Sequence, residues 1–147
     1  MIAMSTGSSK ASLATTMQVC KNRMGVSESS TSFVLPLGAS INMNGLSIKL
    51  GLSVIFFAQA MGVDLALSDY IVIILTGTLG SIGGAGIPGS FIMLTSVGLP
   101  IEGVALLVGI DRILDLLSTT INITGDATIT LVIDSSEGTL DKEMYNS

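Results

Sequence analysis

Long apolar stretches alternate with short polar connectors along the chain. They divide it into segments at 1–25, 31–63, 67–99 and 101–134, followed by a polar tail at 135–147. The second and fourth segments are each long enough to cross a hydrocarbon core of about 30 Å as helices. The pattern predicts an all-α membrane protein.

The third segment, 67–99, contains too many glycines to be one long transmembrane helix. Six glycines and one proline fall within Gly77–Gly89. In a helix each glycine would cost about 1 kcal/mol and the proline about 3 kcal/mol. The arms on either side, Tyr70–Leu79 and Phe91–Leu99, would each be about 15 Å long, which is half of the hydrocarbon core. We therefore predict a re-entrant hairpin with its tip at Gly77–Gly89; the alternative is a turn outside the membrane between two short helices.

The first two segments contain related interruptions. In the first, a polar tip at Ser5–Ser12 precedes a helical stretch at Leu13–Met24, as expected for the second half of a similar hairpin.

The second segment, 31–63, is interrupted in its first half by Pro36, Gly38, Asn42, Asn44 and Gly45. Asparagines beside glycines in an apolar run free backbone carbonyls that can bind a cation, which predicts a broken helix. The alternative is a kinked helix whose asparagines bond to neighbouring helices. Lys49 is costly in this segment unless it pairs or reaches the membrane surface.

The fourth segment carries a polar stripe along one face of a helix. At about 100° per residue, a sector about 100° wide contains Asp111, Asp115, Ser118, Thr119, Asn122 and Asp126. The stripe is about 22 Å long. Carboxylates inside a membrane are costly, so they indicate an ion path, a proton relay or a ligand site. The alternative, an amphipathic helix on a soluble core, is disfavoured by the hydrophobicity of the rest of the chain.

Composition supports lipid as the solvent and excludes several functional classes. Of the 147 residues, 48% are hydrophobic and only 12% are charged, with a mean hydropathy of +0.76. Soluble domains carry about a quarter charged residues. The absence of histidine excludes imidazole metal ligands and histidine-activated nucleophiles. The single cysteine excludes an internal disulfide and a thiolate zinc site, and the net charge of −5 disfavours nucleic acid as a partner.

Four motifs occur in the order and at the spacing of one transporter family. Ser81–Gly89 (SIGGAGIPG) resembles the second hairpin tip of the dicarboxylate/amino acid:cation symporters, the glutamate transporter family. Leu35–Gly45 (LPLGASINMNG) resembles the broken seventh helix of that family, and Gly109–Asp126 its eighth helix. Gly7–Leu13 is similar to the serine-rich tip of its first hairpin. Together these motifs cover almost the whole chain.

The resemblance implies the core of an elevator-type transport domain, built from re-entrant helical hairpins and broken transmembrane helices. Family members have six earlier transmembrane helices that include a trimerisation scaffold. The chain is therefore expected to be the C-terminal part of a carrier that is a homotrimer in its full-length form. The resemblance further implies a multi-pass protein of the cell (inner) membrane and no enzyme activity. Expected partners are Na⁺, with the proton as an alternative, a small amino acid or dicarboxylate, and the lipid bilayer.

The resemblance also implies binding roles for individual residues. Asp115 would bind the substrate amino group, and the substrate would be held by Ser9, Ile87, Asp115, Ser118, Thr119 and Asn122. One sodium site would comprise Asp126 with the carbonyls of Gly38, Asn42 and Asn122. A second site, closed by the hairpin, would comprise the carbonyls of Ser40, Met43, Ser81, Ile82 and Gly84. Oxygen ligands suit a hard cation, and a carboxylate is the natural partner of an ammonium group.

Departures from the family pattern bear on the substrate and the ions. Acidic-substrate members have an arginine where this chain has Ser118, and serine cannot bind a carboxylate through two parallel hydrogen bonds. A neutral amino acid is therefore favoured. Lys10, in the first hairpin tip, offers a displaced positive charge, which keeps an acidic amino acid or a dicarboxylate as the alternative. Asn44 and Leu46 replace the aspartate and threonine of the seventh-helix motif, which weakens the expectation of three-sodium coupling.

Two alternatives compete with a working carrier. Intramembrane aspartyl proteases also place aspartates in membrane helices, but they need a Gly-x-Gly-Asp motif. Here Ile123 precedes Thr124-Gly125-Asp126, and no Tyr-Asp pair lies in an apolar run, so a protease is disfavoured. The other alternative is that the isolated chain, without a scaffold, transports nothing by itself.

Overall fold

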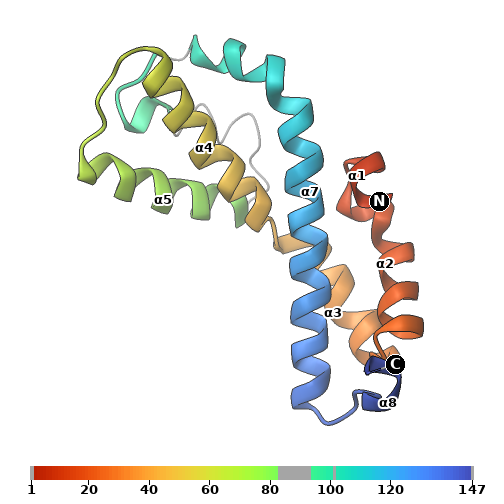
Figure 1. Ribbon diagram of the computed structural model, residues 1–147. Coiled ribbons are helices and arrows are strands. Elements are labelled where there is room, and N and C mark those ends of the chain that lie inside the picture. Colours follow the sequence, from red (N-terminus) through yellow and green to blue (C-terminus); the bar gives the residue numbers. More distant parts are fainter. Residues whose placement is uncertain (1, 83–93, 101, 147) are drawn as a thin grey trace. The chain divides into compact units, whose positions relative to one another are not determined.

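The computed structural model describes residues 2–82, 94–100 and 102–146, and the regular elements in these ranges are helices (Figure 1). In chain order these are α1 (Ile2–Thr6), α2 (Ser9–Arg23), α3 (Glu28–Ile41), α4 (Asn44–Ala60), α5 (Leu67–Ile82), α7 (Gly103–Ser136) and α8 (Lys142–Tyr145). They form two compact units. Unit 1 comprises Met1–Asn42 and Thr119–Ser147, and unit 2 comprises Met43–Ser118. The predicted all-α class is confirmed for the described part of the chain.

Two stretches, Glu28–Ala60 and Ile113–Ser136, are long and apolar enough to cross a membrane. Large apolar side chains also face outward from the helices. Phe33 of α3 is 72% exposed, and Leu67 and Leu79 of α5 are 78% and 70% exposed. Such side chains are unfavourable in water and favourable against lipid or apolar protein. The surface therefore agrees with a membrane environment.

The first of these stretches is interrupted at Asn42 and Met43, where α3 ends and α4 has not yet begun. Asn42 has an extended backbone, and its N–H donates to the carbonyl of Gly38 at 2.8 Å. The helix resumes at Asn44, whose side-chain oxygen accepts a hydrogen bond from the N–H of Gly45 at 2.9 Å. The side chain of Asn44 thus supplies a local polar partner at the start of α4.

The interruption is narrower than the sequence predicts, because Pro36 and Gly38 lie inside α3. A proline removes one backbone donor and crowds the preceding turn. The buried face of α3, formed by Thr31, Leu35 and Ala39 at intervals of four residues, offsets that cost by packing against the rest of unit 1. Packing therefore keeps the helix continuous through the proline.

Helix α5 also extends further than the sequence predicts. Gly77 and Gly80, which we expected in the hairpin tip, are helical. Ile73, Gly77 and Ser81 share the buried face of this helix. The remainder of the predicted tip, 83–89, lies outside the described residues, as does the start of the second arm.

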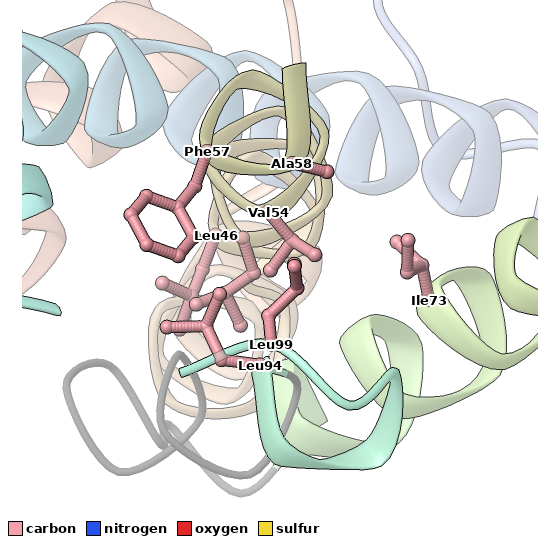
Figure 2. Packing of buried hydrophobic residues seen from close by; sticks show 8 residues of the cluster. Leu46, Val54, Phe57, Ala58, Ile73, Leu94 and Leu99 are labelled. Atoms are coloured by element: carbon pink, nitrogen blue, oxygen red, sulfur yellow. The ribbon is translucent and has the colours of Figure 1, made fainter. Parts of the chain in front are cut away.

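The core of unit 2 is built on one face of α4. Leu46, Leu50 and Val54 recur at intervals of four residues and continue into Phe57 and Ala58. Figure 2 shows Leu94 and Leu99, from the segment before α7, beside the side chains of α4, and Ile73 of α5 belongs to the same buried cluster. The predicted second hairpin arm thus packs on α4 through the leucines of 94–99.

Unit 1 packs α2 against α3 and against the second half of α7. Its buried centre is Cys20, Val26 and Leu35, and apolar side chains from α7 and the tail surround it: Ala127, Leu131 and Leu140. The segment predicted as a polar tail, 135–147, therefore contributes to this core and contains α8.

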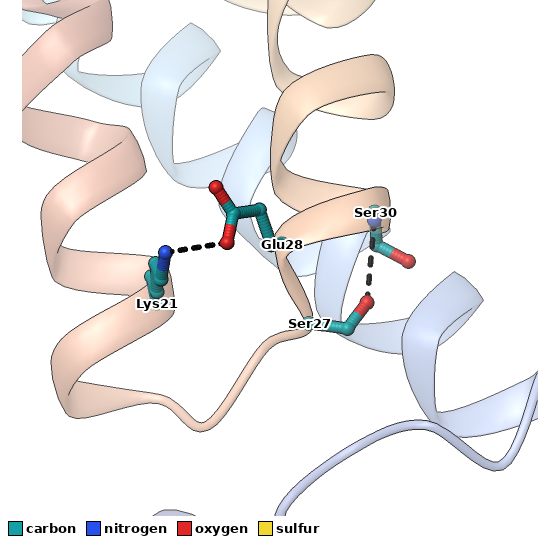
Figure 3. A network of polar contacts seen from close by, with 4 residues as sticks. All are labelled: Lys21, Ser27, Glu28 and Ser30. Atoms are coloured by element: carbon teal, nitrogen blue, oxygen red, sulfur yellow. Dashed lines mark hydrogen bonds and ion pairs between the residues drawn. The ribbon is translucent and has the colours of Figure 1, made fainter.

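Short polar contacts fix the turn between α2 and α3. Ser27 caps α3 by accepting a hydrogen bond from the N–H of Ser30 at 3.2 Å, and Lys21 pairs with Glu28 at 2.8 Å (Figure 3). Gly25 has φ +68°, and a Cβ there would collide with the carbonyl of Asp141. A glycine is therefore required at this position for two reasons.

Candidate functional site

The carboxylate of Asp126 is the centre of a polar cluster in unit 1. Asp126 lies in the second half of α7 and is only 5% exposed. Its Oδ1 accepts a hydrogen bond from Nδ2 of Asn42 at 2.8 Å. The same amide group lies 3.5 Å from the carbonyl oxygen of Asn122. The residue at the end of α3 is thereby fixed to the polar stripe of α7.

Gly38 completes the cluster because it allows α3 to approach Asp126 closely. A Cβ at Gly38 would lie 2.6 Å from Oδ1 and 3.0 Å from Cγ of Asp126. The four residues expected to form the first sodium site, Gly38, Asn42, Asn122 and Asp126, therefore lie together within one unit. Carboxylate and carbonyl oxygens are ligands suited to a hard cation such as Na⁺. The amide of Asn42 donates to the oxygen that a cation would use, so cation binding there would displace this hydrogen bond.

Thr130 supports Asp126 from one helical turn further along α7. Its hydroxyl donates to the backbone carbonyl of Asp126 at 2.6 Å, and its side chain is fully buried. Thr119 and Asn122, predicted to hold the substrate α-carboxylate, are buried on the same helix. The sequence prediction did not include Thr130, although it follows Asp126 by four residues and so belongs to the same helical face.

Asp134 is a second buried carboxylate of unit 1 that the sequence prediction missed. Its Oδ2 accepts the backbone N–H of Ser27 at 3.0 Å, and its Oδ1 accepts the hydroxyl of Ser27 and, at 2.6 Å, that of Thr139. It thus joins the end of α7 to the start of α3. Its spacing of eight residues from Asp126 was the available signal, because that interval places both residues on neighbouring parts of one helical surface.

Unit 2 contains an ion pair on the same polar stripe. Nζ of Lys49, on α4, lies 3.3 Å from Oδ1 of Asp115, on α7. The lysine side chain is 9% exposed and the aspartate side chain 39%. Ser118 is buried one turn away on α7, where a Cβ at Gly45 would collide with its carbonyl oxygen. The residue predicted to bind a substrate ammonium group is therefore in contact with an ammonium group of the protein.

The remaining predicted ligands are not brought together within one unit. Of the second sodium set, Ser40 belongs to unit 1, Met43, Ser81 and Ile82 belong to unit 2, and Gly84 lies outside the described residues. Ile87 is also outside them, and Ser9 occupies the first turn of α2 in unit 1. These assignments stay predictions.

A cavity of about 500 Å³ in unit 1 lies between α2 and α7. Its lining includes Ser12, Thr15, Cys20, Ile123 and Ala127. None of the predicted substrate or sodium residues that the structure describes lines this cavity, so it is separate from the cluster around Asp126.

The long apolar helices, the interrupted helix and the buried polar stripe are features of an all-α integral membrane protein. Comparison with known families then places the chain: it belongs to the sodium:dicarboxylate symporter family, whose profile matches residues 1–136. The family resemblance drawn from the four motifs is confirmed. Because this is a family of transporters, an enzyme is not the expected class.

Several curated proteins are similar over most of the chain. An excitatory amino acid transporter of Caenorhabditis elegans is 42% identical over 130 residues, covering 85% of this chain and 26% of that protein. Excitatory amino acid transporter 1 of Rattus norvegicus is 43% identical, covering 85% and 24%. The proton/sodium-glutamate symport protein of Geobacillus stearothermophilus is 39% identical over 147 residues, covering 97% and 35%. The chain thus spans between a quarter and about a third of the length of these relatives.

Proposed function

We propose that the chain forms the C-terminal part of the transport domain of a carrier that moves a small amino acid across a membrane together with Na⁺. The observation that carries this proposal is the cluster of Asp126, Asn122, Asn42 and Gly38. Within it, one buried carboxylate lies beside the end of α3, where the helix is interrupted, and contacts Asn42 and Gly38. Membership in the sodium:dicarboxylate symporter family supports the same interpretation.

Sodium is the cation that we propose for this cluster, with the proton as the alternative. A single carboxylate with several carbonyl oxygens offers hard, uncharged ligands and one negative charge, which suits a monovalent metal cation. The name of the Geobacillus relative, a proton/sodium-glutamate symport protein, includes both ions. We extend the proposal to a homotrimer in the cell (inner) membrane on the strength of family membership alone.

For the substrate we propose the roles that the family resemblance implies. Asp115 would bind the ammonium group, and Thr119, Asn122 and the backbone at Ser9 would bind the α-carboxylate. Ser118 and Ile87 would border the substrate side chain. The replacement of an arginine by Ser118 favours a neutral side chain. The second candidate is an acidic amino acid or a dicarboxylate, whose additional carboxylate Lys10 in the first hairpin tip would bind.

Uptake by the full-length gene product tests the proposal. Reconstituted into vesicles, it should accumulate radiolabelled serine or aspartate when an inward Na⁺ gradient is imposed, and not when choline replaces Na⁺. An inward proton gradient without Na⁺ should drive little uptake. Uptake that is indifferent to Na⁺ but follows the proton gradient would overturn sodium coupling. Uptake of neither class of amino acid under any gradient would overturn the proposed function. By the same assay, the isolated 147-residue chain should transport nothing.

A further inference from the structure

Two buried polar contacts bracket the interface between α3 and α7 in unit 1. At one end, the backbone N–H and the hydroxyl of Ser27 donate to the carboxylate of Asp134. At the other end, the amide of Asn42 donates to the carboxylate of Asp126, against which Gly38 closes. Because Ser27 precedes Asn42 whereas Asp134 follows Asp126, these parts of the two helices lie side by side and antiparallel (Figure 1).

Thr31 and Thr130 lie at the same depth between the two contacts. Thr31 follows Ser27 by four residues and Thr130 precedes Asp134 by four residues, which is about 6 Å along each helix. Thr31 belongs to the buried face of α3 and is 1% exposed, and Thr130 is fully buried. The two threonines are therefore neighbours across the interface of α3 and α7.

The hydroxyl of Thr31 is bonded differently from those of other helical threonines. Four of them donate to the backbone carbonyl four residues earlier, at 2.6–3.0 Å: Thr16, Thr124, Thr128 and Thr130. The corresponding carbonyl for Thr31 is that of Ser27, which accepts the N–H of Thr31 at 3.0 Å but not its hydroxyl. Among the residues that the structure describes, Thr31 Oγ1 is buried and has no hydrogen-bond partner. A buried hydroxyl in this state is costly, so a partner is expected.

The neighbouring hydroxyls define what that partner must offer. The hydroxyl of Thr130 donates its hydrogen to the carbonyl of Asp126, so its oxygen can only accept a further bond. The hydroxyl of Ser27 likewise donates to Asp134, and its oxygen has one remaining acceptor position beside the bond from the N–H of Ser30. Thr31 has a hydrogen to donate. The partner must therefore accept one hydrogen bond and donate two.

We propose that one buried water molecule binds between α3 and α7 and bridges Thr31 to Thr130. It accepts from the hydroxyl of Thr31 and donates to the hydroxyl oxygens of Thr130 and Ser27, and about three hydrogen bonds are typical of a buried water. Thr31 and Thr130 make no direct hydrogen bond, and water commonly bridges polar groups that are too far apart for one. A metal cation is less suited to this position, because none of the three oxygens is charged.

The water joins the polar contacts around Asp126 to those around Asp134. Thr130 bonds to the backbone of Asp126, and Ser27 bonds to the side chain of Asp134. With the water between them, α3 and α7 share one continuous hydrogen-bonded column through the interior of unit 1. The inference does not depend on the proposed function, because neither a substrate nor a coupled ion takes part in it.

An experimental density map of the full-length gene product, at a resolution that shows ordered water, tests the proposal directly. We expect a peak within hydrogen-bond distance of the hydroxyl oxygens of Thr31 and Thr130. The peak should be the same in protein prepared in Na⁺ and in protein prepared in choline. A peak that disappears in choline would identify a cation and contradict the proposal. A map without a peak, in which the Thr31 hydroxyl donates to the carbonyl of Ser27, would also overturn it.

Thermal unfolding of the full-length gene product in detergent gives a second test. Thr31→Val keeps the shape of the side chain and removes the hydroxyl that the water needs. It should lower the melting temperature by at least about 1 °C. Thr128→Val is the matched control, because Thr128 is exposed and its hydroxyl bonds within α7; its melting temperature should not fall. Thr31→Ser retains the hydroxyl and should retain the density peak.

The sign of the Thr31→Val effect separates a bound water from an unpartnered hydroxyl. If the hydroxyl had no partner, its replacement by a methyl group would raise the melting temperature, and that result would contradict the proposal. An unchanged melting temperature would contradict it as well. If Thr31→Val does not fold, the density map of the wild type decides alone.

Discussion

The side-chain amide of Asn42 donates a hydrogen bond to the carboxylate of Asp126, across 84 positions of sequence. Asn42 marks the end of α3, and Asp126 lies on the polar stripe of α7. The bond therefore connects the interruption of one membrane helix with a buried charge on another. A helix interruption frees carbonyl oxygens and the carboxylate adds negative charge, and both features suit the cation site that we propose.

Gly38 should tolerate no side chain, because it lies against Asp126. In Gly38→Ala the new Cβ would meet Oδ1 at 2.6 Å, so either the carboxylate or α3 must move. We expect the Na⁺ concentration for half-maximal uptake to rise at least several-fold, and overpacking to cost about 1–3 kcal/mol of stability.

Gly80→Ala is the matched control for this substitution. Gly80 is also helical, and a Cβ there would meet no atom within 4 Å. Removing a glycine from an open helical position should stabilise the helix by about 0.5–1 kcal/mol. Uptake and thermal unfolding of both variants would be measured in parallel. Equal Na⁺ dependence in the two variants would show that the contact between Gly38 and Asp126 has no role in cation binding.

We expect Asp134 to contribute to the stability of the fold and not to cation binding. Asp134→Ala would leave the N–H and hydroxyl of Ser27 without their buried acceptor, at a cost of about 1–3 kcal/mol in the free energy of unfolding. Glu137→Ala, at an exposed position close to Asp134 in sequence, is the control. It should change the free energy of unfolding by less than about 0.5 kcal/mol. Thermal unfolding of the full-length gene product in detergent measures both. A double-mutant cycle with Ser27→Ala should show a coupling of at least about 0.5 kcal/mol. Additive effects of the two substitutions would mean that the contact between Asp134 and the Ser27 hydroxyl does not contribute to stability.

If 67–99 forms the predicted re-entrant hairpin, its two ends should lie on the same side of the membrane. Cysteines at Ser68 and Pro100, both exposed, would report on this. Leu99 is unsuitable because it is buried in the core of unit 2, and Cys20 is buried and would be replaced by alanine. In cells, both introduced cysteines should react with a membrane-impermeant maleimide from the same side. Labelling from opposite sides would mean that 67–99 crosses the membrane once.

The apolar pattern predicted the helices and the polar stripe on α7, because both depend on the regular spacing of a helix. The grouping of Gly38 and Asn42 with Asn122 and Asp126 was instead implied by the family resemblance. Asp126, Asn122, Asn42 and Gly38 were all named in advance, and the structure places them together. The extent of the helices was predicted less well. Pro36, Gly77 and Gly80 have low helix propensity, but packing of neighbouring residues outweighs a cost of about 1–3 kcal/mol each.

Contacts between distant segments could not be derived from local pattern. Lys49 was recognised as costly in a membrane, but nothing in its own segment identifies Asp115 as the partner 66 positions away. Asp134 was omitted because its role depends on the turn at Ser27, which only the folded chain brings to the end of α7. In both cases the residue type indicated that a partner was needed, and the fold decided which one.

The sodium dependence of Asp126→Asn tests the account most directly. Asparagine keeps the size of the side chain and removes the negative charge, so a cation held by this carboxylate should bind much more weakly. The full-length gene product would be reconstituted into vesicles, and uptake would be measured against Na⁺ concentration for wild type, Asp126→Asn and the exposed control Asp64→Asn. We expect half-maximal uptake to require at least about tenfold more Na⁺ in Asp126→Asn, as for the loss of about 1.4 kcal/mol of binding free energy, and no change in Asp64→Asn. A Na⁺ dependence in Asp126→Asn that equals that of wild type would contradict the assignment of the cation site to Asp126.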